Sequence, residues 1–165
     1  MLAVFMRSEH PRRGLAILAL LLLALAQTAT AAGGTWNKIR YQGGTIEAKV
    51  NPFDWNTTIR LTSTAIQIDF ASLKTVTIEA RNVIALTSGD MARRRVADML
   101  VFTPTSRPIP LFGIIHTGKD HLVGIEFKNL DGSRGAILLL VHKDSYRELL
   151  QGISSLTGKP VEDTP

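Results

Sequence analysis

The sequence predicts a mainly β (α+β) domain: an antiparallel sheet that ends in one amphipathic helix. Apolar and polar residues alternate repeatedly between residues 45 and 88, which is the period of strands with one face in a core and one in water. Near the C-terminus, apolar residues instead recur at helical spacing after residue 144. An apolar block at the other end of the chain predicts an N-terminal signal helix before the domain.

Residues 1–31 are predicted to be an export signal. Three arginines precede an unbroken apolar run at 15–26, and the small residues at 29–31 offer a cleavage site. About 20 apolar residues are needed to cross a bilayer as a helix, so an uncleaved membrane anchor is the second alternative. Two adjacent arginines at 12–13 also allow a twin-arginine signal, although the leucine-rich run is more typical of general secretion. We therefore expect a periplasmic or extracellular protein, or a membrane-anchored one.

The composition after residue 31 narrows the class of protein. The remaining 134 residues fit one domain and keep 16 basic and 13 acidic residues, a net charge of +3. Proteins that bind nucleic acid usually concentrate far more positive charge on one face, so no nucleic-acid partner is expected. The chain has no cysteine, which excludes disulfides, thiol catalysis and cysteine-ligated zinc.

Five strands are expected in the first half of the domain, separated by turns rich in Asn, Pro, Ser and Gly. Their ranges are 45–50, 58–62, 66–70, 75–79 and 83–88. In the first of them, Ile46, Ala48 and Val50 face one way, while the charged residues between them face the other. The pattern predicts an antiparallel meander with one solvated face.

A hairpin and a helix are expected in the second half. The apolar runs 121–128 and 136–142 flank Asp131-Gly132, a dipeptide that favours a tight turn. The helix is predicted to begin at Asp144 or Ser145, with Ser145 and Glu148 forming a capping box, and to end at Gly158. Its apolar face comprises Tyr146, Leu149, Leu150, Ile153 and Leu156.

A long insertion, residues 89–120, separates the meander from the hairpin. It is expected to begin with one or two helical turns, and prolines then divide its apolar content into halves too short to span a bilayer. The surplus apolar residues must pack on the outside of the domain, on a partner or on an anionic membrane surface. The alternative is a solvated turn followed by core residues. Possible membrane or partner contacts are Arg93, Arg94, Arg95, Leu100, Val101, Phe102, Leu111 and Phe112.

Other candidate sites have simpler interpretations. His116 and His121 have the spacing of half a zinc site, but the other half is missing, so both are expected to be ordinary loop histidines. Ser145 lies near Asp144 and His142, yet a helix cap explains it better than a nucleophile. Three aromatic residues at expected strand ends either rim a ligand site or close the core: Trp36, Phe53 and Trp55. No catalytic residue, metal or cofactor is expected.

The order of a strand meander, a hairpin and one C-terminal helix resembles the pleckstrin-homology-like domains. Similar segments are typical of uncharacterised exported or membrane-linked bacterial proteins, and they are residues 39–45, 94–96, 143–150 and 157–160. The resemblance covers residues 39–161 and implies a partly open seven-stranded antiparallel barrel capped by the helix and used for binding. Lipid-binding members place Lys and Arg in the first hairpin loop, whereas residues 51–56 here contain neither.

The domain is therefore expected to span 32–161, with the insertion at 89–120 and a tail at 162–165. We predict a non-enzymatic exported interaction module at or near the bacterial membrane, with an unknown protein or an anionic membrane surface as partner. One alternative is a carrier of small ligands in the barrel interior, which a helix packed across the barrel mouth would oppose. The other is a hydrolase without a recognisable motif, which would need titratable side chains that meet in a cleft.

Overall fold

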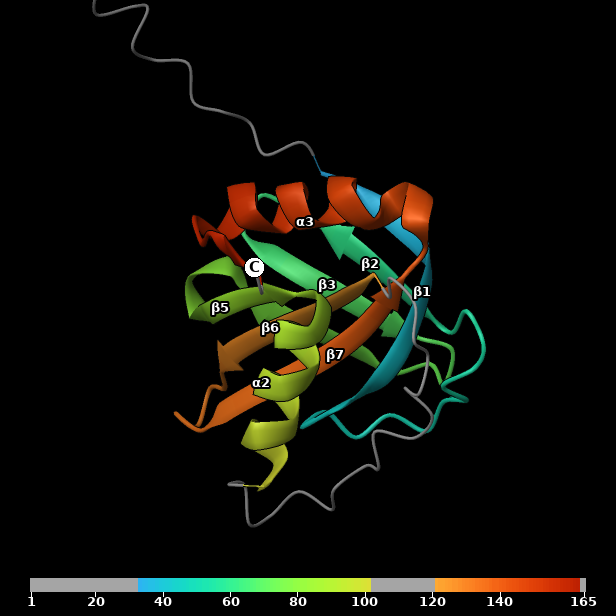
Figure 1. Ribbon diagram of the computed structural model, residues 1–165, viewed down its shortest axis with the longest axis horizontal. Helices are drawn as coiled ribbons and strands as arrows, with labels where there is room; N and C mark the ends of the chain where they lie inside the picture. The colour runs from blue at the N-terminus through green and yellow to red at the C-terminus, as the bar shows by residue number, and fades with distance from the viewer. Residues whose placement is uncertain (1–32, 102–120, 164–165) are drawn as a thin grey trace, which may run out of the picture. The chain divides into compact units, whose positions relative to one another are not determined.

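The computed structural model describes residues 33–101 and 121–163 of the chain, and its strands form one eight-stranded, mostly antiparallel open sheet (Figure 1). The strands are β1 (Thr35–Gly44), β2 (Thr57–Leu61), β3 (Ala65–Phe70), β4 (Thr75–Glu79), β5 (Val83–Ser88), β6 (Leu122–Lys128), β7 (Arg134–Val141) and β8 (Val161–Glu162). The helices are η1 (Ala80–Asn82), α2 (Gly89–Val101) and α3 (Lys143–Thr157). The sheet order is β4-β3-β2-β1-β7-β6-β5-β8, and only the β5–β8 pair is parallel. The prediction of a mainly β domain with a C-terminal helix is confirmed.

The predicted strand at 45–50 is wrong, because the first strand is β1, which precedes it. β1 ends where Gly43 and Gly44 take positive φ values of 142° and 145° and its pairing register with β7 shifts. Gly44 lies so close to β7 that a Cβ there would be 2.2 Å from the carbonyl oxygen of Ala136. The chain then leaves the ladder, although Ile46 still faces the core. The alternation at 45–50 therefore indicated which residues face the core, but it did not indicate a strand.

Tyr41 ties this irregular segment to the core. Its buried hydroxyl donates a 2.6 Å hydrogen bond to the carbonyl oxygen of Ile46, and its ring meets that of Phe70 edge-on at 5.1 Å. Burial raises the pKa of the Tyr41 hydroxyl well above its usual value, since the phenolate would be desolvated there. The segment after β1 is thus fixed by one side chain rather than by a strand ladder.

The remaining predicted strands and the hairpin are confirmed as β2 to β7, with Gly132 at a φ of 86° in the hairpin turn. The helix is also confirmed as α3, but its start differs from the prediction. His142, not Asp144 or Ser145, is the N-cap residue, and its Nδ1 accepts a 3.4 Å hydrogen bond from the Asp144 amide. Glu148 accepts a 3.3 Å bond from the Trp36 indole instead of completing a capping box. Gly158 ends the helix at a φ of 68°, as expected.

The interior of the sheet is a packed core, and α3 lies across one end of the strands (Figure 1). Leu149 and Ile153 of α3 are fully buried in the same cluster as core residues of β1, β2 and β3. The helix therefore fills the end of the core that a ligand carrier would need to keep open.

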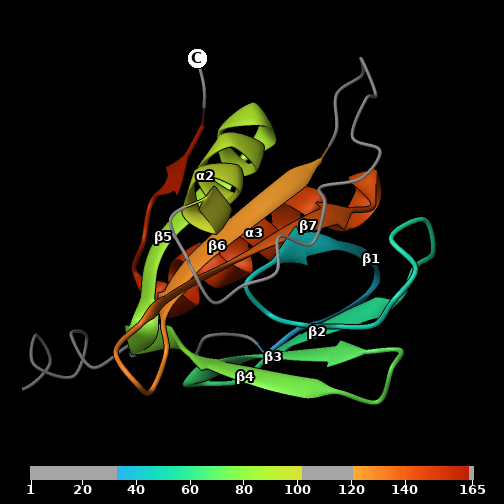
Figure 2. The same cartoon turned by 90° about the horizontal axis from the view of Figure 1, so that it is seen from below.

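A second apolar layer lies on the outer face of the sheet, where α2 runs beside β5 and β6 (Figure 2). The helix is longer than the one or two turns expected, and it packs Ala92, Val96 and Leu100 against residues of β6 and β7. Gly124 of β6 allows this close approach, because a Cβ there would lie 3.1 Å from the Cβ of Ala92. Part of the insertion thus covers the outside of the domain.

Glu162, where the C-terminal tail was predicted to begin, belongs to the short strand β8. β8 pairs with β5, with Val161 opposite Leu86 and Glu162 opposite Thr87. The chain turns back toward β5 after α3, where the Ser154 hydroxyl donates a 2.7 Å bond to the carbonyl oxygen of Lys159. A parallel pairing of two residues leaves no periodic signal in a sequence, so the prediction missed it.

Candidate functional site

The predicted contact residues of the insertion divide into two groups. Phe102, Leu111, Phe112 and the side chain of Val101 lie outside the described residues. Leu100 is not available as a surface contact, because it lies on the side of α2 that packs against the sheet and is only 8% exposed. The three arginines of α2 remain as candidates.

Arg95 holds α2 to the sheet rather than facing a partner. Its guanidinium lies 3.3 Å from the carboxylate of Glu126 on β6 and also pairs with Glu162 on β8. Arg134 of β7 approaches the second oxygen of Glu126 at 2.8 Å. The Glu126 side chain is 2% exposed, so this buried carboxylate needs both guanidiniums. Arg93 pairs with Asp90 one turn earlier in α2.

We expect Arg95→Ala to lower the free energy of unfolding by about 1 to 2 kcal/mol, since Glu126 would keep only one of its two partners. Arg94→Ala removes an exposed neighbour of equal charge and should change stability by less than about 0.5 kcal/mol. Urea denaturation of the two variants measures the difference. Equal midpoints for both would show that the Arg95 contacts contribute nothing.

The other residues considered in the sequence have structural contacts. The ring of His121 meets that of Tyr146 edge-on at 4.8 Å, while His116 lies outside the described residues. The Ser145 amide donates a 3.0 Å bond to the carbonyl oxygen of His142, so Ser145 lies within the first turn of α3 and is not its cap. Within residues 33–101 and 121–163, no three His, Asp or Glu side chains come together as a metal site would require.

Three exposed apolar side chains belong to two neighbouring loops, and we call them the loop patch: Phe53, Trp55 and Leu73. Phe53 and Trp55 belong to the β1–β2 loop and are 63% and 44% exposed, and Leu73 in the β3–β4 loop is 96% exposed. The amide of Ala71 donates a 2.8 Å bond to the carbonyl oxygen of Asn56. The ammonium group of Lys74 donates a 2.6 Å bond to the carbonyl oxygen of Glu47. The two loops therefore meet at one end of the strands (Figures 1 and 2).

The aromatic residues predicted at strand ends take different roles. Trp36 is buried in the core. Trp55 is held at the surface, with the Arg40 guanidinium 4.2 Å from its ring centroid and the His142 ring 5.7 Å away. A cation over an indole face is an attractive contact. Trp55 is therefore presented in a fixed position, with much of its ring exposed.

Leu73 is the member of the loop patch that sequence reasoning missed. It is the one non-glycine residue with positive φ, 63°, in the described part of the chain. This conformation costs an L-residue with a side chain roughly 1 to 2 kcal/mol, and it belongs to the β3–β4 turn, where the Leu73 amide donates a 3.0 Å bond to the carbonyl oxygen of Phe70. The available signal was a leucine between Ser72 and Lys74 in an otherwise polar turn. A turn position that favours glycine or asparagine thus carries an almost fully exposed leucine.

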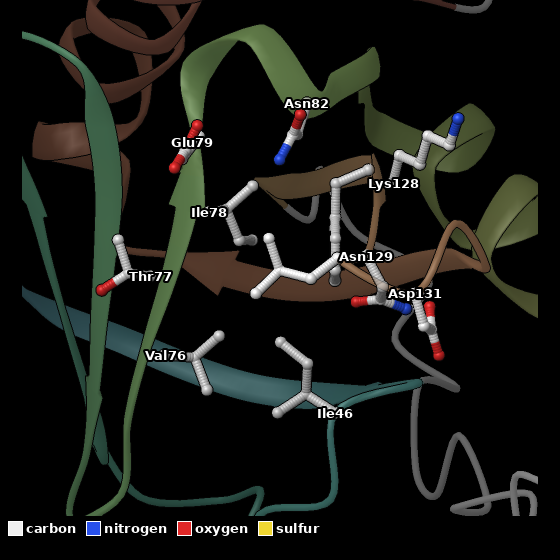
Figure 3. Close-up of a pocket in the computed structure, with 11 residues that line it drawn as sticks. Ile46, Val76, Thr77, Ile78, Glu79, Asn82, Lys128, Asn129 and Asp131 are labelled. Atoms are coloured by element: carbon white, nitrogen blue, oxygen red, sulfur yellow. The ribbon is translucent and has the colours of Figure 1, made fainter.

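A cleft of about 610 Å³ opens between β4 and the β6–β7 turn (Figure 3). Apolar residues form much of its lining, and polar side chains surround them: Ile46, Val76, Ile78, Phe127, Leu130, Thr77, Glu79, Asn82, Lys128, Asn129 and Asp131. Glu79 pairs with Arg81 at 2.6 Å. Hydrogen bonds from Ser133 lower the pKa of Asp131 below its usual value. The polar groups lie around an apolar centre, so the cleft suits an apolar ligand.

Comparison with known proteins finds similarity only among solved structures, and it is distant. No protein-family model and no curated protein matches the chain. The chain is similar to one in a solved structure of the Spt16D–Pob3N heterodimer, with 11% sequence identity and a TM-score of 0.45. The match covers 82% of this chain and 56% of the other, so the chain spans little more than half of that neighbour. Within the described ranges, no helix combines the length and apolar character needed to cross a membrane.

Proposed function

We propose that this chain is an exported, non-enzymatic interaction domain that contacts a membrane surface through the loop patch. The observation that carries the proposal is Leu73, an almost fully exposed leucine in a left-handed backbone conformation. The backbone conformation belongs to the β3–β4 turn, but the exposed leucine side chain does not favour the isolated domain and is compatible with placement for an external apolar phase. Phe53 and Trp55 on the adjoining loop extend the same surface.

The proposed architecture is pleckstrin-homology-like. Seven antiparallel strands in the order β4-β3-β2-β1-β7-β6-β5, closed by α3, support this assignment, with β8 as an addition to the sheet. The first hairpin loop has no cation at 51–56, but Lys49 precedes it, and Lys74 of the β3–β4 loop reaches the carbonyl oxygen of Glu47 in the same preceding segment. We therefore propose apolar insertion with modest electrostatic support.

The expected energies favour the loop patch over the arginines of α2. Fully burying a large apolar side chain gains about 1.5 to 3 kcal/mol, whereas each cation near an anionic bilayer contributes about 1 kcal/mol. Arg95 is already engaged with two carboxylates. The packed interior also argues against the alternative of a ligand carrier, because Leu149 and Ile153 occupy the barrel end.

Vesicle flotation of the protein tests this proposal with a matched pair of variants. Leu73 and Leu130 are both 96% exposed, but Leu130 lies in the β6–β7 turn. We expect Leu73→Ser to reduce binding to phosphatidylglycerol vesicles about tenfold, because it removes an inserted side chain, and Leu130→Ser to leave binding unchanged. Equal binding by both variants, or none by the parent at low salt, would exclude the loop patch as a membrane contact.

A further inference from the structure

The two outer edges of the sheet differ in whether another strand covers them. At one edge, β5 is covered by β8, so its backbone groups have a partner strand. At the other edge, β4 pairs with β3 alone among the described residues. The outward amide and carbonyl groups of β4 are therefore available to another strand.

β4 lacks the features that usually protect an open edge. Its sequence, Thr-Val-Thr-Ile-Glu, contains no Lys and no Pro, and its pairing with β3 runs without a bulge from Thr75 to Glu79. Thr, Val and Ile are strong strand formers. A regular edge of this kind is a template for an added strand unless something covers it.

The cleft described above lies directly beside this edge (Figure 3). Ile46, Val76 and Ile78 form its apolar floor, and the β6–β7 turn bounds its far side. The half-buried side chain of Asn82 lies at its rim. An unpaired edge, an apolar floor and a polar amide at the rim therefore share one location.

We propose that this cleft binds an extended, uncharged peptide segment of a partner protein, which adds to β4 as a further strand. The peptide backbone pairs with β4, one aliphatic side chain enters the floor near Val76, and the Asn82 amide bonds the peptide backbone. The rim favours an uncharged segment, because its charges are balanced. The positive charge of Lys128 offsets the negative charge of Asp131, and Glu79 forms an ion pair with Arg81. This site is separate from the loop patch, and the inference does not depend on the proposed membrane contact.

A peptide fits this site better than a second folded copy does. The space beside β4 is bounded by residues 127–131, so an occupant must be narrow enough to lie between two walls. A single extended strand meets this condition, whereas a second domain would bring its own sheet into the same space. Dimerisation through β4 is nevertheless a result that the experiment must detect.

The test uses the isotope-labelled protein and a capped peptide, Lys-Gly-Val-Thr-Val-Thr-Val-Gly-Lys, whose uncharged segment Val-Thr-Val-Thr-Val is the proposed added strand and whose terminal lysines keep it in solution. We expect saturable changes in the amide NMR signals of residues 75–79, of the Asn82 side chain and of residues 128–131. The same peptide with its three valines N-methylated cannot pair through those amides, so its binding should be at least about tenfold weaker. Loop-patch variants should bind the peptide as the parent does.

Two variants locate the binding site. Val76→Glu places a charge in the apolar floor and Asn82→Ala removes the amide at the rim, so each should weaken binding about tenfold or more. Gln151→Glu adds the same charge on the exposed surface of α3 and should have no effect. Signals confined to β5 and β8 or to the loop patch, equal binding by the N-methylated peptide, or no change with millimolar peptide would overturn the proposal. So would sedimentation showing a dimer that Val76→Glu abolishes.

Discussion

Leu149→Ala or Ile153→Ala is expected to lower the free energy of unfolding by about 2 to 5 kcal/mol, the range for truncating fully buried aliphatic side chains. Both residues belong to α3, have no exposed surface, and pack among the core residues of β1 to β3. Each truncation would leave a cavity under the helix that surrounding side chains fill only partly. Urea denaturation followed by circular dichroism measures the loss.

Gln151 provides the control on the same helix. It is exposed, so Gln151→Ala should change stability by less than about 0.5 kcal/mol. Denaturation midpoints of the Leu149 and Ile153 variants that equal that of Gln151→Ala would place the apolar face of α3 in solvent and contradict the architecture.

Gly124→Val is expected to cost about 3 kcal/mol, at the upper end of the range for overpacking a close contact. A Cβ at this position would lie 2.3 Å from Thr87 Oγ1 and 3.2 Å from the Cα of Ala92. The first contact is inside the sheet and the second is the backbone of α2, so α2 must move away from β6. Thermal or urea unfolding measures the cost.

A double variant distinguishes a clash between residue 124 and α2 from an effect of the new side chain on β6 itself. Ala92→Gly removes one of the atoms that a Cβ at residue 124 would meet. Gly124→Ala should therefore cost less stability in the Ala92→Gly background than in the parent, with a coupling of about 1 kcal/mol. Purely additive losses would mean that contact with α2 is not what requires a glycine here.

The sequence predicts the regular part of this fold well because its signals are local. Alternation over five or six residues located β2 to β5, and Asp131-Gly132 located the hairpin between β6 and β7. The signal failed at β1, a strand of ten residues that ends in two glycines. The apolar residues that alternate after it face the core, but that segment pairs with no strand in the described part of the chain. It also missed β8, whose existence depends on a contact with β5, far away in the chain.

The candidate site was less predictable, because composition does not show which side chains the fold already uses. Arg95 and Leu100 looked like surface contacts, but a buried carboxylate on β6 and the apolar outer face of the sheet engage them. Phe53 and Trp55 were identified as candidates, whereas Leu73 depends on a backbone angle that no sequence pattern specifies. The β4 cleft joins segments from β4 and the β6–β7 turn, so only the fold could reveal it.

The central claim is that the loop patch enters a membrane surface, and Trp55 reports on it directly. The chain has two tryptophans, and Trp36→Phe leaves Trp55 as the only one. After circular dichroism confirms that this variant folds, its fluorescence is recorded with phosphatidylglycerol vesicles that contain brominated lipid. Our account predicts a shift to shorter wavelength and quenching by the bromine atoms, because the Trp55 ring leaves water for the acyl boundary. Unchanged wavelength and intensity at vesicle concentrations that float the protein would contradict it.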